Sequence, residues 1–273
     1  MSDYYTKLCE SVFAISAEQR CDFCMASGHE LLPKVINGKI SPPKMQAKFS
    51  SSALALNMLG PISNCKLPGS CWDELFALRG FFGNREVETH FEKKLRVPAV
   101  RGYAPNLDFF ITCGPRCVGV ESKYHEMYHR KHNQTVQEQY IDRFEWWSEF
   151  EGLRIVADKV SDYTGGGRLD AAQLVKHCLA LISSAKRNGN DGKFRLVYIY
   201  HDIVDEKIAK EHKEGLDKFV ETANLGRRFL HLEYSKFLVR LKNFLPQIYD
   251  REDYINFLVH RYADLRVKEL LVH

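Results

Sequence analysis

The 273-residue sequence lacks several features that would define a class of protein at once. It has no apolar run near the roughly 18 residues that a membrane span needs. Its start, MSDYYTKLCESVF, has no positively charged segment leading into an apolar stretch, so it does not read as a signal peptide. The net charge of +4 is too small to establish a nucleic-acid partner, although a local basic cleft is compatible with it. We expect a globular cytoplasmic protein that does not enter a membrane.

Cysteine is present but follows no recognisable pattern. The 8 scattered cysteines of a chain of this length indicate reduced thiols rather than a disulfide framework. Cys21 and Cys24 form a CxxC pair, but no second pair at zinc-finger spacing accompanies them. A zinc-stabilised interaction protein built around these two residues stays open as an alternative. The run Gly165-Gly166-Gly167 lacks the Gly-Lys-Ser/Thr end of a phosphate-binding loop, which argues against nucleotide hydrolysis.

Hydrophobic periodicity divides the chain into helical and strand-like segments. Apolar spacing of three to four predicts helices and near-alternation predicts strands. The predicted helices are 3–32, 51–60, 72–83, around 132–150 and 169–186, and the predicted strands are 87–97, 104–113, 117–123 and 194–201. Three consecutive strands, then helix, strand and helices, predict an α/β (mixed α+β) fold with a central mixed four- to five-stranded sheet flanked by helices.

The same pattern predicts one domain with additions at both ends. Residues 1–44 are expected to form a helical N-terminal extension and residues 45–204 the core. Residues 205–273 are expected to form a mainly helical C-terminal region packed on that core. No internal repeat and no low-complexity linker divides the chain.

The strands around a Gly114-Pro115 turn place charged residues close together. If this turn centres an antiparallel hairpin, Asp108 lies across from Glu121 with Cβ atoms about 5 Å apart. Two like charges at that distance repel each other, and Lys123, one step along on the same face, offsets only part of the repulsion. A divalent cation between the carboxylates removes the conflict, and hard oxygen ligands favour Mg²⁺ or Mn²⁺.

These residues resemble a known nuclease pattern. The segments NLDFFI and GVESK are similar to the PD-(D/E)xK nuclease superfamily, and most similar to a restriction-endonuclease-like bacterial branch of it. That branch also has segments similar to SSALALN upstream and QLVKH downstream. The four segments are 106–111, 119–123, 51–57 and 173–177, and the likeness covers roughly residues 45–200.

The resemblance implies a metal-dependent active site. Asp108, Glu121 and the backbone carbonyl of Ser122 would hold Mg²⁺ or Mn²⁺. Lys123 would orient or deprotonate the attacking water and stabilise developing negative charge. A helix-borne glutamine often touches this region in the superfamily, which gives Gln173 a place among the catalytic residues.

Further residues are assigned supporting roles. Glu88, on the strand before Asp108, is an additional candidate metal ligand. The segment KYHEMYHRKH, residues 123–132, mixes bases with aromatic rings, which suits phosphate contact and stacking but is equally typical of a solvated basic stretch. Nucleic-acid contacts are assigned to Asn57, Tyr124, Arg130, Lys176 and His177.

The sequence therefore predicts a metal-dependent endonuclease that hydrolyses DNA phosphodiester bonds, related to restriction or defence. Double-stranded DNA is the expected partner, and a homodimer is the natural assembly for cutting both strands at symmetric sites. The alternative is a catalytically inactive nucleic-acid-binding protein with a nuclease-like fold. The presence of Asp108, Glu121 and Lys123 together argues against that alternative.

Overall fold

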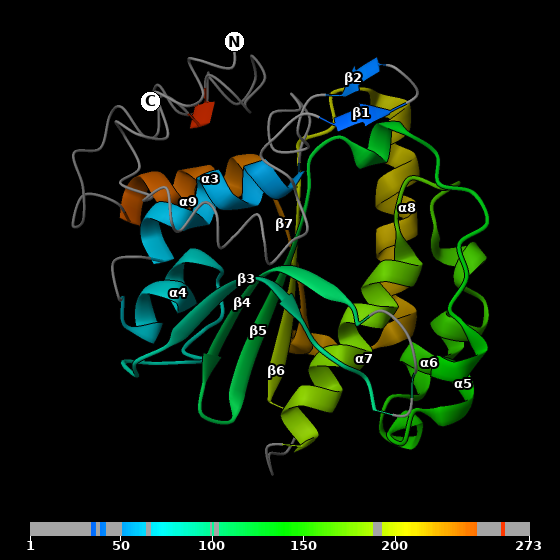
Figure 1. Cartoon of the computed structure of the whole chain (residues 1–273), viewed down its shortest axis with the longest axis horizontal. Helices are drawn as coiled ribbons and strands as arrows, with labels where there is room; N and C mark the ends of the chain where they lie inside the picture. Colours follow the sequence, from blue (N-terminus) through cyan, green and yellow to red (C-terminus); the bar gives the residue numbers. More distant parts are fainter. Residues whose placement is uncertain are drawn as a thin grey trace.

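The computed structural model describes residues 34–36, 39–41, 51–63, 67–98, 100, 104–187, 193–244 and 258–259. A mixed sheet lies between two layers of helices (Figure 1). The fold class expected from the sequence is confirmed. The predicted helix over 3–32 and the Cys21–Cys24 pair lie outside the described residues.

The sheet has five strands in the spatial order β3-β4-β5-β6-β7. The first three strands pair antiparallel, and β6 and β7 continue the sheet in parallel with β5. A two-residue turn joins β4 to β5, whereas each parallel pairing requires a helical crossover. The strands are β3 (Glu88–Lys94), β4 (Asn106–Cys113), β5 (Arg116–Lys123), β6 (Phe194–Tyr200) and β7 (Phe229–Glu233).

Two apolar cores cover the two faces of the sheet. On one face, Phe109 and Val120 pack with residues of three helices. On the other face, Leu196 and Phe194 pack with residues of four helices. The first group of helices is α3 (Ser51–Ser63), α4 (Gly69–Leu75) and α9 (Tyr234–Phe244), and the second is α5 (Glu138–Arg143), α6 (Glu151–Asp158), α7 (Ala171–Arg187) and α8 (Glu206–Ala223).

The helix α7 lies directly on the sheet because its sequence is apolar along most of its surface. Its buried positions include Leu174, Val175, Cys178 and Leu181, and it packs on β5 and β6. Asp170 precedes the helix and accepts a hydrogen bond from the backbone N–H of Gln173 at 3.0 Å, as an N-cap does. Short 3₁₀ turns lie at Glu126–Tyr128, Trp147–Glu149, Val160–Tyr163 and Gly226–Arg228.

The four predicted strands are confirmed, and the differences concern other elements. A small hairpin, β1 (Lys34–Ile36) with β2 (Lys39–Ser41), lies where a helical extension is expected. The helix predicted over 72–83 ends at Leu75, because the backbone turns left-handed at Ala77 with a φ of 55°. The strand β7 lies within the region expected to be mainly helical, since its five residues are too few for a clear alternation.

No helix in the described part of the chain combines the length and the apolar character that crossing a membrane requires.

The loop at Gly165-Gly166-Gly167 has positive φ angles at all three glycines and lies tightly against α8. It leads into the first turn of α7 and so helps to position that end of the helix.

Candidate active site

The antiparallel hairpin of β4 and β5 has the register that the Gly114-Pro115 turn predicts. Thr112 pairs with Cys117, and the ladder continues to the pair Phe109–Val120. The ladder ends there, one step before position 108. Asp108 instead accepts a hydrogen bond from the backbone N–H of Ser122 through Oδ2 at 2.7 Å.

The strand β3 is also distorted beside Asp108. The pairs Phe91–Phe109 and Lys93–Leu107 leave Glu92 between them, opposite Asp108, and Glu92 has a φ of 48°. Left-handed backbone is uncommon outside glycine and marks a local departure from regular pairing. Asp108 therefore sits beside an irregular point of the sheet, where its carboxylate accepts the hydrogen bond from the backbone N–H of Ser122.

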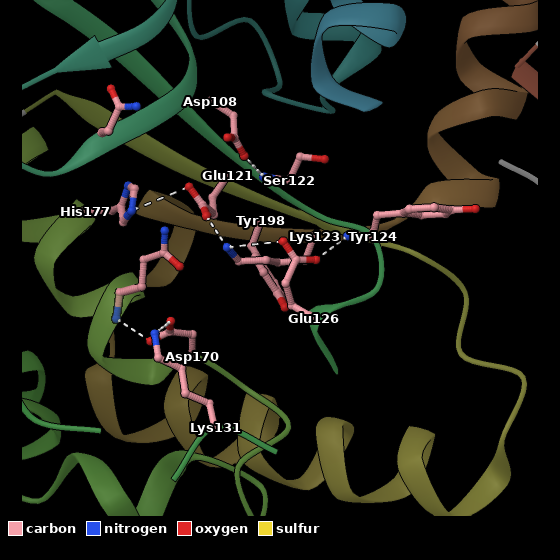
Figure 2. A network of polar contacts seen from close by, with 12 residues as sticks. Asp108, Glu121, Ser122, Lys123, Tyr124, Glu126, Lys131, Asp170, His177 and Tyr198 are labelled. Carbon is pink, nitrogen blue, oxygen red and sulfur yellow. Dashed lines mark hydrogen bonds and ion pairs between the residues drawn. The ribbon is translucent and has the colours of Figure 1, made fainter. Parts of the chain in front are cut away.

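Glu121 lies at the centre of a polar cluster (Figure 2). Its side chain is 2% exposed, and its Oε1 atom is 2.7 Å from Nζ of Lys123. Its other oxygen, Oε2, is buried and accepts no hydrogen bond. A buried carboxylate oxygen without a partner is destabilising, so this atom is the strongest local indication that the site takes a ligand.

Asp108 belongs to the same cluster. Burial raises the pKa of the Asp108 carboxyl well above its usual range, and the nearby charge of Glu121 raises it further. Burial likewise raises the pKa of Glu121, although Lys123 acts in the opposite direction. The two acids are thus close enough to oppose each other's ionisation, which is the conflict that a cation would relieve.

Lys123 remains charged in this surrounding. Burial by itself would lower the pKa of Lys123, but the carboxylates of Glu121 and Glu126 raise it above its usual value. Glu126 lies 4.0 Å from Nζ and also accepts hydrogen bonds from the backbone N–H groups of Tyr124 and His125. A lysine that stays protonated is suited to stabilising negative charge rather than to removing a proton.

His177 lies behind Glu121 on α7. Its Nε2 atom is 3.5 Å from Oε2 of Glu121, and its side chain is 1% exposed. Burial, with the charges of Lys123 and Lys176, lowers the pKa of His177 to about 3. The imidazole is therefore neutral at ordinary pH and contacts Glu121 without forming an ion pair. Such a buried ring cannot reach DNA, so the assignment of His177 to nucleic-acid contact is corrected.

A small pocket opens beside Lys123. It has a volume of about 210 Å³ and lies between the ends of β5 and β6 and the start of α7. Gln173 lines it, as the sequence predicts for a residue near the lysine, together with Glu126, Asp170 and Tyr198. Lys176 lies one turn further along α7, half-buried, and burial lowers its pKa.

Several residues of this pocket are absent from the predicted site. Asp170 also pairs with Lys131, and Tyr198 is the β6 neighbour of Glu121 in the parallel ladder. The position of Asp170 directly before an apolar helix is an N-cap signal that the sequence contains. Glu126 and Tyr198 carry no such signal in the sequence. Tyr198 reaches the pocket only because β6 pairs with β5.

Glu88 is not brought to the cluster. It pairs with Thr112, four residues along β4 from Asp108, and its side chain is 80% exposed. The register places Glu92, not Glu88, opposite Asp108. The role of Glu88 as an additional metal ligand is therefore corrected.

Of three further residues assigned to nucleic-acid contact, two are buried. Asn57 is 1% exposed on α3, on the far face of the sheet from α7. Tyr124 is 9% exposed, and its ring packs edge-on against His201. Burial removes both side chains from a DNA surface. Arg130 is more accessible, but it pairs with Glu211 at 2.8 Å and donates to the carbonyl of Gly166.

The donor set at the strand ends fits a small divalent cation in its chemistry. Asp108 and Glu121 supply hard carboxylate oxygens, one of them without a hydrogen bond, and the carbonyl of Ser122 follows on the same strand. Across the described ranges, no group of three or more His, Cys, Asp or Glu side chains is placed to hold a metal ion. The described residues at this site therefore offer a cation two carboxylates and one backbone carbonyl.

A mixed sheet flanked by helices, with two acids and a lysine at its strand ends, is the architecture of a restriction-endonuclease-like core. The comparison with known families agrees with this class. The model of the family described as "Restriction Endonuclease associating with ARP" matches residues 34–263, so the chain belongs to that family. No curated protein and no solved structure matches the chain.

Proposed function

We propose that the protein is a Mg²⁺- or Mn²⁺-dependent endonuclease of the PD-(D/E)xK type that hydrolyses double-stranded DNA in restriction or defence. The observation that carries the proposal is the cluster of Asp108, Glu121 and Lys123, in which Glu121 Oε2 has no hydrogen-bond partner. Membership of a restriction endonuclease family supports a DNA substrate.

Each residue has a role that its surroundings support. Asp108 and Glu121, with the carbonyl of Ser122, would hold the cation, which supplies charge neutralisation and an activated water when bound. Lys123, kept protonated by the acids around it, would contact a phosphate oxygen and stabilise the negative charge that develops there. Gln173 and Tyr198 would border the substrate in the pocket beside Lys123.

The test is cleavage of supercoiled plasmid by purified protein with Mg²⁺, Mn²⁺, Ca²⁺ or EDTA. Nicked or linear product is expected with Mg²⁺ or Mn²⁺ and none with EDTA. Single-stranded DNA and RNA serve as parallel substrates. The proposal would be overturned if the wild-type protein cleaved none of these substrates. It would also be overturned if Asp108→Asn cleaved them as well as wild type does.

A non-catalytic DNA-binding protein with this fold is the second candidate. The observation in its favour is that the described side chains offer only two carboxylates for a cation, without a third. Calorimetric titration with Mn²⁺ separates the two functions. Heat of binding that disappears in Glu121→Gln supports the nuclease, whereas tight DNA binding without any Mn²⁺ heat supports the second candidate.

A further inference from the structure

A group of arginines lies at the end of the sheet away from the candidate active site. Arg116 begins β5, Arg195 is the second residue of β6, and Arg228 directly precedes β7. The pairings Val118–Arg195 and Leu196–Phe229 bring the starts of these three strands side by side. Adjacent strands are about 5 Å apart, so Arg228 lies beside Arg195, and Arg116 lies on the next strand two positions before Val118, the partner of Arg195. We call this group the arginine row. Arg227, beside Arg228, adds a fourth.

Aromatic rings hold these guanidinium groups in place. Arg195 lies 4.4 Å and Arg116 5.8 Å from the ring centre of Phe81. Arg116 also donates to the carbonyl of Phe81, and Arg228 lies 5.6 Å from the ring centre of Phe150. Cation–π contacts orient an arginine without neutralising it, so its remaining N–H groups stay available to an anion.

The charges of this arginine row are not balanced. Among the described residues, none of the four arginines forms an ion pair with a carboxylate, whereas Arg130 and Arg168 both pair with Glu211. Asp73, a described acid whose charge acts on Arg195, accepts hydrogen bonds from the backbone N–H groups of Phe82 and Gly83. Burial lowers the pKa of Arg195, and the neighbouring arginines lower it further. An anionic ligand would relieve this repulsion.

We propose that the arginine row of Arg116, Arg195, Arg227 and Arg228 binds the phosphate backbone of a second DNA segment. Planar guanidinium groups match phosphate oxygens in a two-pronged geometry, which favours phosphates. The choice of DNA as the ligand rests on the proposed function, in which DNA is the substrate.

The segment is a second one because Arg116 and Arg195 lie at the other end of the sheet from Lys123 and against its other face. The seven steps along β5 from Arg116 to Lys123 cover about 23 Å at about 3.3 Å per residue. Phe81, which contacts Arg116 and Arg195, belongs to the core on one face of the sheet, whereas Tyr198, beside Lys123, belongs to the core on the other face. A stiff duplex seated at Lys123 does not bend around the sheet to reach these two arginines. The protein would thus join two segments, one at the acids and one at the arginines.

The experiment is a two-duplex capture in EDTA, where no cleavage takes place. A biotinylated duplex on beads binds the full chain, and a fluorescent second duplex is then added. The variant Arg227→Gln/Arg228→Gln should retain binding to the beads but capture about tenfold less of the second duplex. Both residues are exposed, so their replacement leaves the cores intact. Arg227→Lys/Arg228→Lys, which keeps the charge, should retain most of the capture.

A matched control removes two positive charges elsewhere. Lys207 and Lys218 are exposed on α8, and Lys207→Gln/Lys218→Gln should capture the second duplex as wild type does. Equal capture by wild type and the double arginine variant would overturn the inference.

The outcomes also separate this inference from the proposed function. If the protein cleaves DNA with metal but the arginine variant captures the second duplex as wild type does, the arginine inference is rejected and the proposed function stands. If the arginine variant loses capture but the wild-type protein cleaves no DNA with any metal, the proposed function is rejected and the arginine inference stands.

Discussion

The Nζ atom of Lys123 lies 2.7 Å from Oε1 of Glu121, two positions earlier on the same strand. The pair is not a solvent-exposed edge contact, because the side chains are only 14% and 2% exposed. Removing one member of a buried pair leaves the other charge uncompensated. The same pair therefore contributes to the stability of the end of β5 and supplies two of the groups proposed to act in catalysis.

Replacing Lys123 by Ala should abolish cleavage while leaving DNA binding largely intact. The expected loss in rate is about 100-fold or more, since the lysine supplies the positive charge for the transition state. Plasmid cleavage and duplex binding, each measured on the same preparation, test this. Lys131→Ala is the control, because Lys131 also pairs with an acid of the pocket, Asp170. Full activity in Lys123→Ala would contradict the role.

Replacing Asp108 by Asn should stabilise the metal-free protein by about 1 kcal/mol, or about 2–4 °C, near neutral pH. Burial and Glu121 raise the pKa of Asp108, so its charged form is disfavoured in the fold. The amide oxygen of Asn can still accept the hydrogen bond from Ser122. Thermal unfolding in EDTA measures the change.

The effect of Asp108→Asn should also depend on pH. A raised pKa means that the folded state keeps a proton on Asp108 that the unfolded chain releases. The stabilising contribution of protonated Asp108 is complete below the ordinary pKa, about 3.9, and is lost as pH rises through the folded-state value. The advantage of the Asn variant should therefore grow from acid to neutral pH. An equal stability difference between Asp108→Asn and wild type at acid and at neutral pH would contradict this account.

Replacing Glu121 by Gln should reduce Mn²⁺ affinity at least about tenfold, because the variant loses the negative charge on the oxygen that accepts no hydrogen bond. Isothermal calorimetry gives the affinity directly. Glu88→Gln is the matched control, since Glu88 is exposed and pairs with Thr112 at a distance from the cluster. Equal affinity losses in the two variants would remove Glu121 from the metal site.

Replacing Gly215 by Ala should destabilise the protein by about 2–3 kcal/mol and lower activity. A Cβ atom on Gly215 would lie 2.5 Å from the backbone N of Gly165, in the loop that leads into α7. Backbone atoms cannot move aside as side chains do. Gly226→Ala, where a Cβ atom meets nothing but φ is 55°, should cost about 1 kcal/mol. Urea unfolding of both variants ranks them, and the reverse order would contradict the packing argument.

Replacing His212 by Gln should make the protein less sensitive to acid. Burial, with a contribution from His231, lowers the pKa of His212 to about 4, and its Nε2 atom lies 3.0 Å from the hydroxyl of Tyr198. The unfolded chain takes up this proton near pH 6.5, so wild type loses stability as pH falls from about 6.5 to about 4, by up to about 3 kcal/mol. Unfolding free energies at several pH values should show a smaller decline for the variant.

The sequence by itself determined the strands that carry the site. Near-alternation in β3 and β4 and the apolar run of β6 predict these strands. The Gly114-Pro115 turn predicts the register of β4 with β5, which brings Asp108 and Glu121 into one cluster. These are local effects, because side chains in a strand alternate and a short turn sets the pairing. The ExK spacing places Lys123 beside Glu121 for the same reason.

Only the tertiary structure decided which other residues join them. The parallel pairing of β6 with β5 brings Tyr198 to Glu121, and the packing of α7 buries His177 behind the acid instead of presenting it to DNA. The register of β3 against β4 places Glu92, rather than Glu88, opposite Asp108. Pairings between distant segments and irregular backbone depend on how the whole core packs, and no periodicity along the chain records them.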